Sequence, residues 1–419
     1  MSERKELVGD DVRREIRSFL DRQWDPELPL VEWRERLVDA GWACPGWPVE
    51  WYGRGLSTAD ASLATSVLAA AGIPGPPAGV GIGLAAPTIL EHGSDDVKRR
   101  FLRPIATGEH PWCQLFSEPG YGSDLAGLVT HADRDGDEWV VNGQKLWTTS
   151  AHHAHYGLLV ARTDWDAPKH RGLTCFAIDM RQPGIEARPV RQMNGHASFN
   201  EVFFTAARVT HSNIIGEPGE GWRVALATLA HERRLDRRPP RMSVHPGAGR
   251  TVRAAQAEAD ELLAPYDWYP QRAGRAELAA PLAASLGRNR DPVVRQALAR
   301  LESIVRTAEW TNRRAQAARV LGRPPGAEGS LGKLHGSLIA KTSAEVHALV
   351  AGAQALLVGP ESLLDGVIAQ VLVSVPAASI AGGTDEIQRN IIGERILGLP
   401  KEPQIDRDLP YREVRRNPV

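Results

Sequence analysis

The segment from Trp112 to Thr149 carries the residue types that a large planar cofactor requires. It begins as Trp-Cys-Gln-Leu-Phe-Ser-Glu-Pro-Gly-Tyr-Gly-Ser-Asp, a polar loop with glycines and serines, and it ends as Gln-Lys-Leu-Trp-Thr-Thr. Backbone N–H groups and small hydroxyls can bond the polar edge of such a cofactor, and a flat aromatic side chain can contact its face. Taken alone, the segment also fits a β-rich domain with a packed tryptophan and a serine-rich turn.

A second segment near the C-terminus has the pattern of an anion-binding helix start. The run Ala-Gly-Gly-Thr-Asp-Glu over 381–386 predicts a tight glycine turn that leads into a helix, with Thr384 as the N-cap residue. Free N–H groups at such a helix start suit phosphate oxygens. The same pattern also begins helices that bind no ligand.

A third segment places an acidic residue in line with an apolar helical face. In Thr-Leu-Ala-His-Glu-Arg over 228–233, Glu232 follows Ala225 and Leu229 at helical spacing, so its carboxylate lies in line with apolar side chains. Taken alone, this pattern favours a surface glutamate beside arginines.

Helical regions flank the residues of the first segment. Apolar residues recur at helical spacing over 12–24 and 33–42, and alanine-rich helical segments follow Trp222 at 292–319 and 331–357. We found no internal repeat. The chain therefore runs from helices through a β region and back to helices.

Short apolar runs with turn residues between them predict strands over roughly 112–210. Asn142-Gly143 lies between two such runs and predicts a hairpin turn there, because this dipeptide accepts the positive φ values of a tight turn. Regular strands of this kind favour a small barrel or a sandwich. The stretch 233–250, rich in arginine, proline and glycine, predicts a mobile connection.

Composition sets limits on the class of protein. The 419 residues suffice for two or three domains, and 42% of them are hydrophobic. A formal net charge of −1 argues against a protein that binds nucleic acid or an anionic membrane through its overall field. The three cysteines have no metal-like spacing, the N-terminus has no apolar signal region, and no run reaches the length of a membrane span. We therefore expect a cytoplasmic protein.

Two other patterns resemble ligand-binding sites, but the residues around them argue against such sites. Gly-Val-Gly-Ile-Gly over 79–83 resembles a dinucleotide fingerprint, but it follows Pro-Gly-Pro-Pro instead of a strand. His152, His153 and His155 lie close together without a cysteine or acidic partner, so we expect a structural or surface role for them.

The first two segments, together with the Gly216–Trp222 junction between them, resemble the acyl-CoA dehydrogenases in the expected order from about Arg14 to Pro400. The resemblance implies an α+β multidomain fold with an N-terminal α-helical domain over 1–111, a central β-barrel over 112–217 and a C-terminal four-helix bundle over 218–419. It also implies assembly into a homo-oligomer, either a dimer or a tetramer, or into a heterotetramer. The forms of the first and last motifs look like actinobacterial members, some of which act on bulky acyl chains and pair two unlike subunits.

The resemblance implies flavin adenine dinucleotide (FAD) as the cofactor. Residues around the isoalloxazine ring would be Gln114, Phe116, Ser117, Gly122, Ser123, Trp147 and Thr149. Contacts with the nucleotide half would come from Thr384 and Glu386, and from Arg288 across a subunit interface. Ser123, Arg233 and Gly383 would contact the acyl-CoA substrate. Tyr121 and the pair Leu115-Phe116 are bulkier than is usual in the family, which puts the width of the site near the thioester in doubt.

The resemblance also suggests which residue is the base. Many members carry the catalytic glutamate directly before the Gly-Thr of the last motif, where this chain has Gly382. The isovaleryl-CoA dehydrogenase branch carries it on a helix of the third region instead, which points to Glu232. The arginines near it, at 233, 234, 237, 238 and 241, would either reach the CoA phosphates or form a solvated linker face.

These assignments predict an enzyme that oxidises an acyl-CoA to its trans-2-enoyl-CoA and passes electrons to an electron-transferring flavoprotein. Two other classes share the fold: a non-catalytic partner subunit of a heteromeric dehydrogenase, and an oxygen-using flavin oxidase or monooxygenase.

Overall fold

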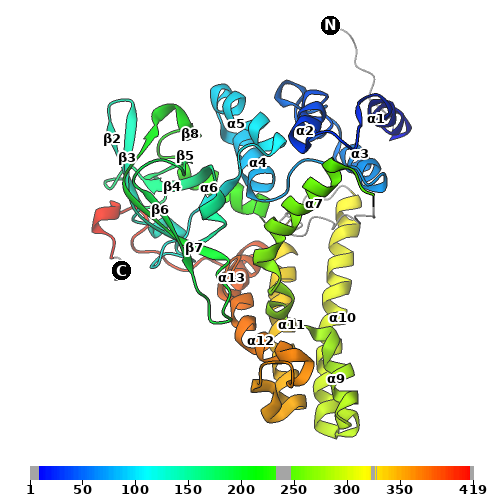
Figure 1. Ribbon diagram of the computed structural model, residues 1–419. Coiled ribbons are helices and arrows are strands. Elements are labelled where there is room, and N and C mark those ends of the chain that lie inside the picture. The colour runs from blue at the N-terminus through cyan, green and yellow to red at the C-terminus, as the bar shows by residue number, and fades with distance from the viewer. Residues whose placement is uncertain (1–8, 233–246, 322–325, 327, 416–419) are drawn as a thin grey trace. The chain divides into compact units, whose positions relative to one another are not determined.

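The computed structural model describes residues 9–232, 247–321, 326 and 328–415 (Figure 1). The chain divides into two compact units. The first comprises Met1–Val190, Ser198–Ala264 and Asp406–Val419, and the second comprises Arg191–Ala197 and Pro265–Ile405. The chain thus leaves the first unit twice and returns to it each time. No helix among the described residues is long and apolar enough to cross a membrane.

Helices open the first unit. They are α1 (Gly9–Gln23), α2 (Leu30–Asp39), α3 (Thr58–Ala70), α4 (Ala86–His92) and α5 (Asp95–Thr107). Val12, Trp33 and Leu37 are fully buried in the core that α1 and α2 share with α3. The indole N–H of Trp33 donates to the carbonyl of Pro74 at 2.7 Å, so this ring is anchored as well as buried. The predicted helices over 12–24 and 33–42 are confirmed as α1 and α2.

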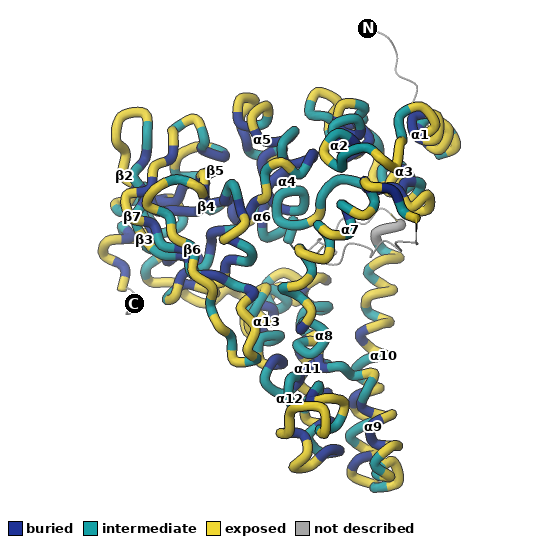
Figure 2. Tube along the Cα trace, in the orientation of Figure 1, coloured by how far each residue is buried: buried dark blue, intermediate teal, exposed yellow. Residues whose placement is uncertain are grey.

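One mixed sheet forms the middle of the first unit. Its strands are β1 (Trp112–Leu115), β2 (His131–Asp135), β3 (Glu138–Thr149), β4 (Tyr156–Arg162), β5 (Leu173–Asp179), β6 (Ile185–Val190), β7 (Phe199–Thr210) and β8 (Ile214–Ile215). They lie in the order β6-β7-β3-β2-β4-β5-β8, with β1 parallel to β4. β4 and β5 are almost entirely buried, as Figure 2 shows in dark blue.

The prediction of a closed barrel is wrong, because this sheet is open. Its end strands, β6 and β8, do not pair with each other, and β8 is only two residues long. β2 and β4 pair at one position only, His131 with Arg162, because β1 occupies the rest of that edge of β4. The two halves of the sheet are therefore joined through one residue pair, and the hydrogen bonds that would close a barrel are not made.

The predicted hairpin turn at Asn142-Gly143 is also wrong. β3 continues through this dipeptide, and the turn between β2 and β3 lies at Gly136, whose φ is +62°. The Asn142 side chain instead accepts a hydrogen bond from the backbone N–H of Ala206 at 2.8 Å, where the register of β3 against β7 shifts. A bulge can require the same Asn-Gly chemistry as a turn, which explains the misassignment.

Two further helices belong to the first unit. α6 (Gly221–Glu232) packs against β5 and α4, and α7 (Arg250–Leu263) packs against α2. An ion pair of 2.7 Å between the buried guanidinium of Arg34 and Glu258 fastens α7 to α2. The greater part of the predicted connection 233–250 lies outside the described residues.

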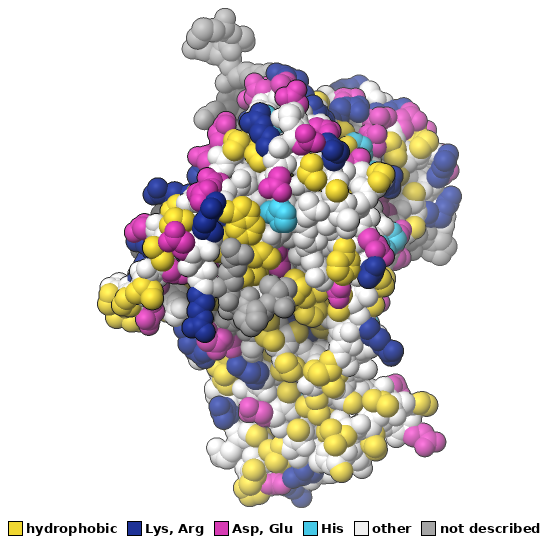
Figure 3. Space-filling model, turned by 90° about the vertical axis from the view of Figure 1, so that its left-hand side faces the viewer, with side chains coloured by type: hydrophobic (Ala, Val, Ile, Leu, Met, Phe, Trp, Pro, Cys, Tyr) yellow, Lys and Arg dark blue, Asp and Glu magenta, His cyan; other side chains and the backbone are white. Residues whose placement is uncertain are grey.

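The second unit is helical, as predicted for the C-terminal region. Its helices are α8 (Tyr269–Arg272), α9 (Ala279–Ser285), α10 (Pro292–Val320), α11 (Glu328–Ala351), α12 (Val367–Ser374) and α13 (Asp385–Arg395). α10 and α11 pack along each other, and their apolar residues form a core with α9 and α12. Large apolar side chains remain exposed on this unit, and Figure 3 shows yellow side chains on one face. The exposed apolar residues of this unit include Leu356, Val358, Ile380, Leu397 and Ile405.

Candidate active site

The loop after β1 is held on one side by the core and on the other by β3. Leu115 and Phe116 are buried, so their bulky side chains face the protein interior. The Ser117 carbonyl accepts a hydrogen bond from the N–H of Leu146 at 2.8 Å, which ties the loop to β3. Gln114 and Ser117 are half-buried. Phe116 can therefore contribute only its backbone to a ligand on the loop surface.

Gly122 and Ser123 form the exposed tip of the same loop. A Cβ built on Gly122 would meet open space, and Ser123 is exposed, so this tip faces outward. Tyr121, next to this exposed tip, is buried. Its ring is 2% exposed and packs against Gly127, where an added Cβ would come within 2.7 Å of the ring. The Tyr121 ring therefore packs beneath the loop, away from its exposed tip.

Trp147 is held outward by an irregularity in β3. Residues 145 and 147 of a regular strand share a face, yet Lys145 is fully buried and Trp147 is 53% exposed. The register shifts between Lys145 and Thr148, and Trp147 adopts a left-handed conformation with a φ of +64°. This conformation costs energy for a bulky residue, and such strain concentrates at functional sites. The indole contacts Phe199 edge-on, and Thr149 beside it is half-buried.

A buried ion pair that the sequence analysis missed fixes the loop and β3 together. Lys145 Nζ lies 2.8 Å from a carboxylate oxygen of Glu118, and it donates to the Phe116 carbonyl at 3.0 Å. The side chains are 0% and 2% exposed. The Glu118 carboxylate also accepts from the N–H groups of Val129 and Thr130 at 2.8 and 3.0 Å. Burial raises the pKa of Glu118, but the ammonium and these N–H groups outweigh it, so the pKa lies below its ordinary value.

A sequence signal for this pair exists in retrospect. Trp139 and Val141 point into the core of the sheet, and Lys145 continues the same alternation inward. A lysine at an inward position needs an anionic partner, and Glu118 is a buried acid in the adjacent loop. The register that brings them together depends on the fold.

Glu232 is the last residue of α6 and is half-buried. Ala225 is fully buried and Leu229 is partly buried, both against the apolar cluster that contains Phe116. The Thr228 hydroxyl forms a hydrogen bond with the Thr88 hydroxyl of α4 at 3.0 Å, which fixes the face that α6 turns toward α4. The helical face predicted from the spacing is therefore confirmed, and it packs on the same core as the loop. Arg233 lies outside the described residues.

A carboxylate bridges two histidines beside this helix end. Glu91 lies 3.3 Å from His231 and 3.5 Å from His92, measured between carboxylate oxygens and Nε2 atoms. Burial lowers the pKa of His92, with Glu91 opposing that effect. These contacts join the C-terminal turn of α6 to α4.

The C-terminal motif lies in the second unit and has the local geometry predicted for it. Thr384 caps α13 by accepting from the N–H of Ile387 at 3.3 Å. Gly382 and Gly383 have φ values of +70° and +85°, which only glycine adopts freely. The Gln388 amide donates to the Gly382 carbonyl at 3.0 Å and fills the space beside Gly383. Glu386 is exposed.

Asp385 anchors this motif to α11, which the sequence analysis also missed. Its carboxylate is buried and contacts Lys333 at 3.2 Å and Lys341 at 2.8 Å. Burial raises the pKa of Asp385, but hydrogen bonds from Lys341, Ser337 and Lys333 outweigh it and hold the pKa well below the usual range. Two ammonium groups thus meet one carboxylate directly at the start of α13.

Arg288 already has partners within its own unit. Its guanidinium donates to the Leu349 and Val350 carbonyls near the end of α11 and pairs with Asp291 at 2.9 Å. The last carbonyls of a helix lack intrahelical partners, so this arginine caps α11. Its role toward a cofactor of a neighbouring subunit stays a prediction.

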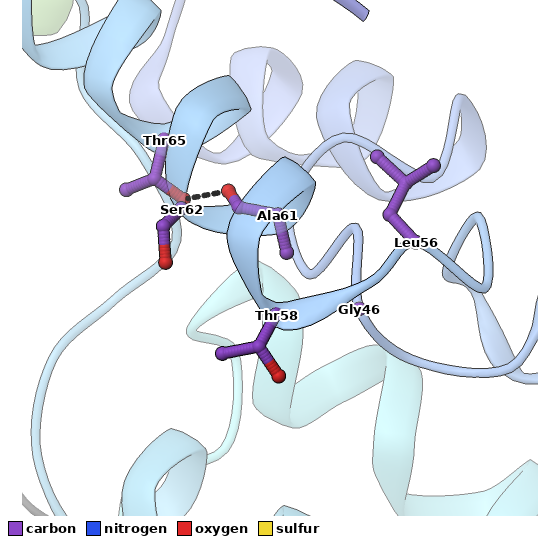
Figure 4. A pocket seen from close by; sticks show the side chains of 6 residues that line it. All are labelled: Gly46, Leu56, Thr58, Ala61, Ser62 and Thr65. Carbon is purple, nitrogen blue, oxygen red and sulfur yellow. Dashed lines mark hydrogen bonds between the residues drawn. The ribbon is translucent and has the colours of Figure 1, made fainter. Parts of the chain in front are cut away.

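The remaining features carry no chemistry of this kind. The glycines of 79–83 lead into a helical turn, Gly81–Ala85. His152 bonds Asn200, and no group of three His, Cys, Asp or Glu residues suited to a metal occurs among the residues described. A hollow of about 450 Å³ beside α3 is lined by small apolar and hydroxyl residues, none of them charged (Figure 4). It includes no predicted site residue.

Comparisons with known proteins agree with this arrangement. Sequence models of the acyl-CoA dehydrogenase N-terminal, middle and C-terminal domains match residues 2–109, 113–207 and 283–397. The chain belongs to the acyl-CoA dehydrogenase family. Members of this family are FAD-dependent oxidoreductases, and the three matched regions account for the helix, sheet and helix order of the chain.

Relatives in actinobacteria cover most of the chain. Acyl-CoA dehydrogenase FadE34 of Mycobacterium tuberculosis is 38% identical over 89% of this chain, which spans only 47% of that protein. Acyl-CoA dehydrogenase IpdE1 of the same organism is 36% identical over 88% of both chains. The solved Tcur3481-Tcur3483 steroid acyl-CoA dehydrogenase (TM-score 0.62, 26% identity) and the ChsE4-ChsE5 complex of M. tuberculosis (TM-score 0.59, 29% identity) each match 96% of this chain and 100% of their own.

Proposed function

We propose that this chain oxidises the α,β bond of an acyl-CoA thioester to a trans-2-enoyl-CoA, with FAD as the electron acceptor and Glu232 as the base. One observation carries the assignment of the base. Gly382 stands where many family members have a carboxylate, while Glu232 ends a helix whose apolar face packs on the same core as the predicted ring-binding loop.

Each residue has a defined role in this reaction. The Glu232 carboxylate takes the proton from Cα, and the electron pair of that C–H bond forms the C=C bond. Bound FAD supplies the acceptor for the hydride that leaves Cβ. The Glu118–Lys145 pair keeps the loop at 116–118 and β3 at fixed positions, so the donors of the loop need no rearrangement during the reaction.

The first unit fits the ring of a flavin. The exposed indole of Trp147, which the left-handed backbone turns outward, supplies a flat surface. The open loop tip at Gly122 and the half-buried hydroxyl of Ser117 supply polar donors. In the second unit, the capped glycine turn at Thr384 supplies N–H groups suited to phosphate oxygens. We therefore assign Gln114, Ser117, Ser123, Trp147 and Thr149 to the ring side and Thr384 and Glu386 to the nucleotide side.

The substrate class that we favour is a CoA thioester with a bulky, polycyclic acyl group. One matched structure is a steroid acyl-CoA dehydrogenase, and the match covers 96% of this chain. That structure and ChsE4-ChsE5 each pair two named proteins, so we further propose an oligomer that can contain an unlike subunit. An electron-transferring flavoprotein would reoxidise the enzyme.

Anaerobic titration with a panel of acyl-CoA thioesters tests the proposal. We expect the purified protein to be yellow, to contain close to one FAD per chain, and to lose its flavin absorbance with a steroid-derived acyl-CoA faster than with a straight-chain one. Flavin that no thioester bleaches until a second subunit is added would instead identify a non-catalytic partner. Rapid reoxidation in air with release of peroxide would identify an oxidase.

A further inference from the structure

The last described segment of the chain returns to the first unit and packs against the region that follows the predicted ring-binding loop. Tyr411 is 1% exposed, and its hydroxyl donates to the carbonyl of Gly127. Its backbone N–H donates to the Ala167 carbonyl at 3.0 Å, and the N–H of Arg412 donates to the Trp165 carbonyl at 3.0 Å. We call residues 406–415 the C-terminal strap.

A buried arginine lies directly beneath the strap. The Arg162 guanidinium is fully buried and lies 3.5 Å from the centre of the Tyr411 ring. It donates to the carbonyls of Ala126 at 2.7 Å and Leu128 at 3.2 Å. Arg162 and Tyr411 together therefore bind three successive carbonyls, at 126, 127 and 128. A buried guanidinium in this position depends on the aromatic face above it and on these carbonyls, since it is shielded from water.

The backbone N–H groups of the next two residues connect this segment to the loop. Those of Val129 and Thr130 donate to the Glu118 carboxylate, which pairs with Lys145. The backbone of Glu118 in turn exchanges two hydrogen bonds of 3.1 Å with Tyr121. Segment 126–130 is thus bound through its carbonyls by the strap and Arg162 and through its N–H groups by the loop.

We infer that Tyr411 and Arg162 are positioning residues for the cofactor loop: the C-terminal strap fixes segment 126–130, and that segment fixes the carboxylate that holds residues 116–121. The inference rests on the proposed function for its effect on FAD. Its mechanical part, the ordering of segment 126–130, stands independently of any ligand.

Tyr411→Phe tests the inference with the least disturbance. It keeps the ring over Arg162 and removes only the O–H that satisfies the Gly127 carbonyl. The matched control is Arg412→Ala in the same strap, which removes an exposed ion pair with Asp166 that contributes little. Two measurements are made on each full-length chain: amide hydrogen exchange of the FAD-free protein, and FAD affinity from quenching of flavin fluorescence.

For Tyr411→Phe we expect the Val129 and Thr130 amides to exchange about tenfold faster and FAD to bind about three- to tenfold more weakly, the scale of one lost hydrogen bond. Arg412→Ala should change neither. Unchanged exchange in Tyr411→Phe, or an equal change in Arg412→Ala, would overturn the inference.

The two proposals can fail separately. If the wild-type chain binds no FAD, the proposed function fails, while the exchange data still decide whether the strap orders the segment. If FAD binds equally well to wild type and Tyr411→Phe despite faster exchange, the strap orders the segment but does not position the cofactor loop. Should Tyr411→Phe unfold, Arg162→Lys provides the second variant, because it keeps the charge but cannot reach both carbonyls.

Discussion

The two segments that we propose to bind the cofactor are each held by a buried carboxylate paired with lysine, in different surroundings. In the first unit, Glu118 and Lys145 pair at 2.8 Å and are both withdrawn from water. In the second unit, Asp385 pairs with Lys333 and Lys341, whose side chains are 20% and 44% exposed. A pair without water must have every donor and acceptor satisfied by protein, whereas a partly hydrated lysine can exchange its partner for solvent.

The difference matches the ligand expected at each place. The ring side requires fixed backbone donors, and the Glu118 carboxylate and Lys145 together hold backbone groups at Phe116, Val129 and Thr130. The nucleotide side would meet phosphates, and two ammonium groups against one carboxylate leave excess positive charge beside α13. The Glu118–Lys145 pair thus fixes backbone positions, whereas Asp385 with its two lysines also leaves positive charge beside α13.

The variant Lys145→Met should have the largest effect on stability and tests the difference between the two anchors. This change leaves the Glu118 carboxylate buried without its cation, so we expect unfolding free energy to fall by about 3–5 kcal/mol. Chemical denaturation measures it. Arg188→Met, which removes an exposed pair with Glu186, is the control and should cost less than about 1 kcal/mol. A similar small loss for both variants would show that the buried pair is not an anchor.

Asp385→Asn should have a smaller effect. The amide can still accept one hydrogen bond, and Lys341 can turn to water, so we expect a loss of about 1–3 kcal/mol. Glu386→Gln, at the exposed neighbouring position, should change stability little. The same denaturation curves decide this prediction. A loss as large as that of Lys145→Met would remove the distinction between the two anchors.

The smallest expected effect is a change in the free energy of unfolding at low pH, caused by protonation of Asp385. The pKa of Asp385 is lowered by folding, so its contribution is complete above the ordinary aspartate pKa of about 3.9 and is lost as pH falls from there toward the folded value. The stability gap between wild type and Asp385→Asn should therefore narrow below about pH 4. A gap that stays constant from pH 6 to pH 3 would show that this carboxylate is not held in its ionised form.

Local patterns in the sequence predicted local structure well. The order of helices and strands, the cap at Thr384 and the apolar face that leads to Glu232 all follow from residues near one another in the chain. Each of these features depends on the helical or strand period or on one turn, which the sequence displays directly.

Features that depend on register were missed or wrong. Asn142-Gly143 fits a bulge as well as a turn, and only the pairing of β3 with β7 decides between them. The sheet is open because its end strands β6 and β8 do not pair, and β2 meets β4 at one position only because β1 pairs with the same edge of β4. The partnership of Glu118 with Lys145 and the burial of Tyr121 likewise arise when distant segments meet.

The central claim, that the proton leaves through Glu232 while the ring lies on the loop and β3, is tested most directly by rapid anaerobic mixing of Glu232→Gln with a thioester that bleaches the wild type. We predict that the variant keeps FAD and still binds the thioester, seen as a shift of the flavin spectrum, but that bleaching slows by at least about a thousandfold, within the range attributed to a positioned acid–base group. Bleaching at the wild-type rate would contradict the account.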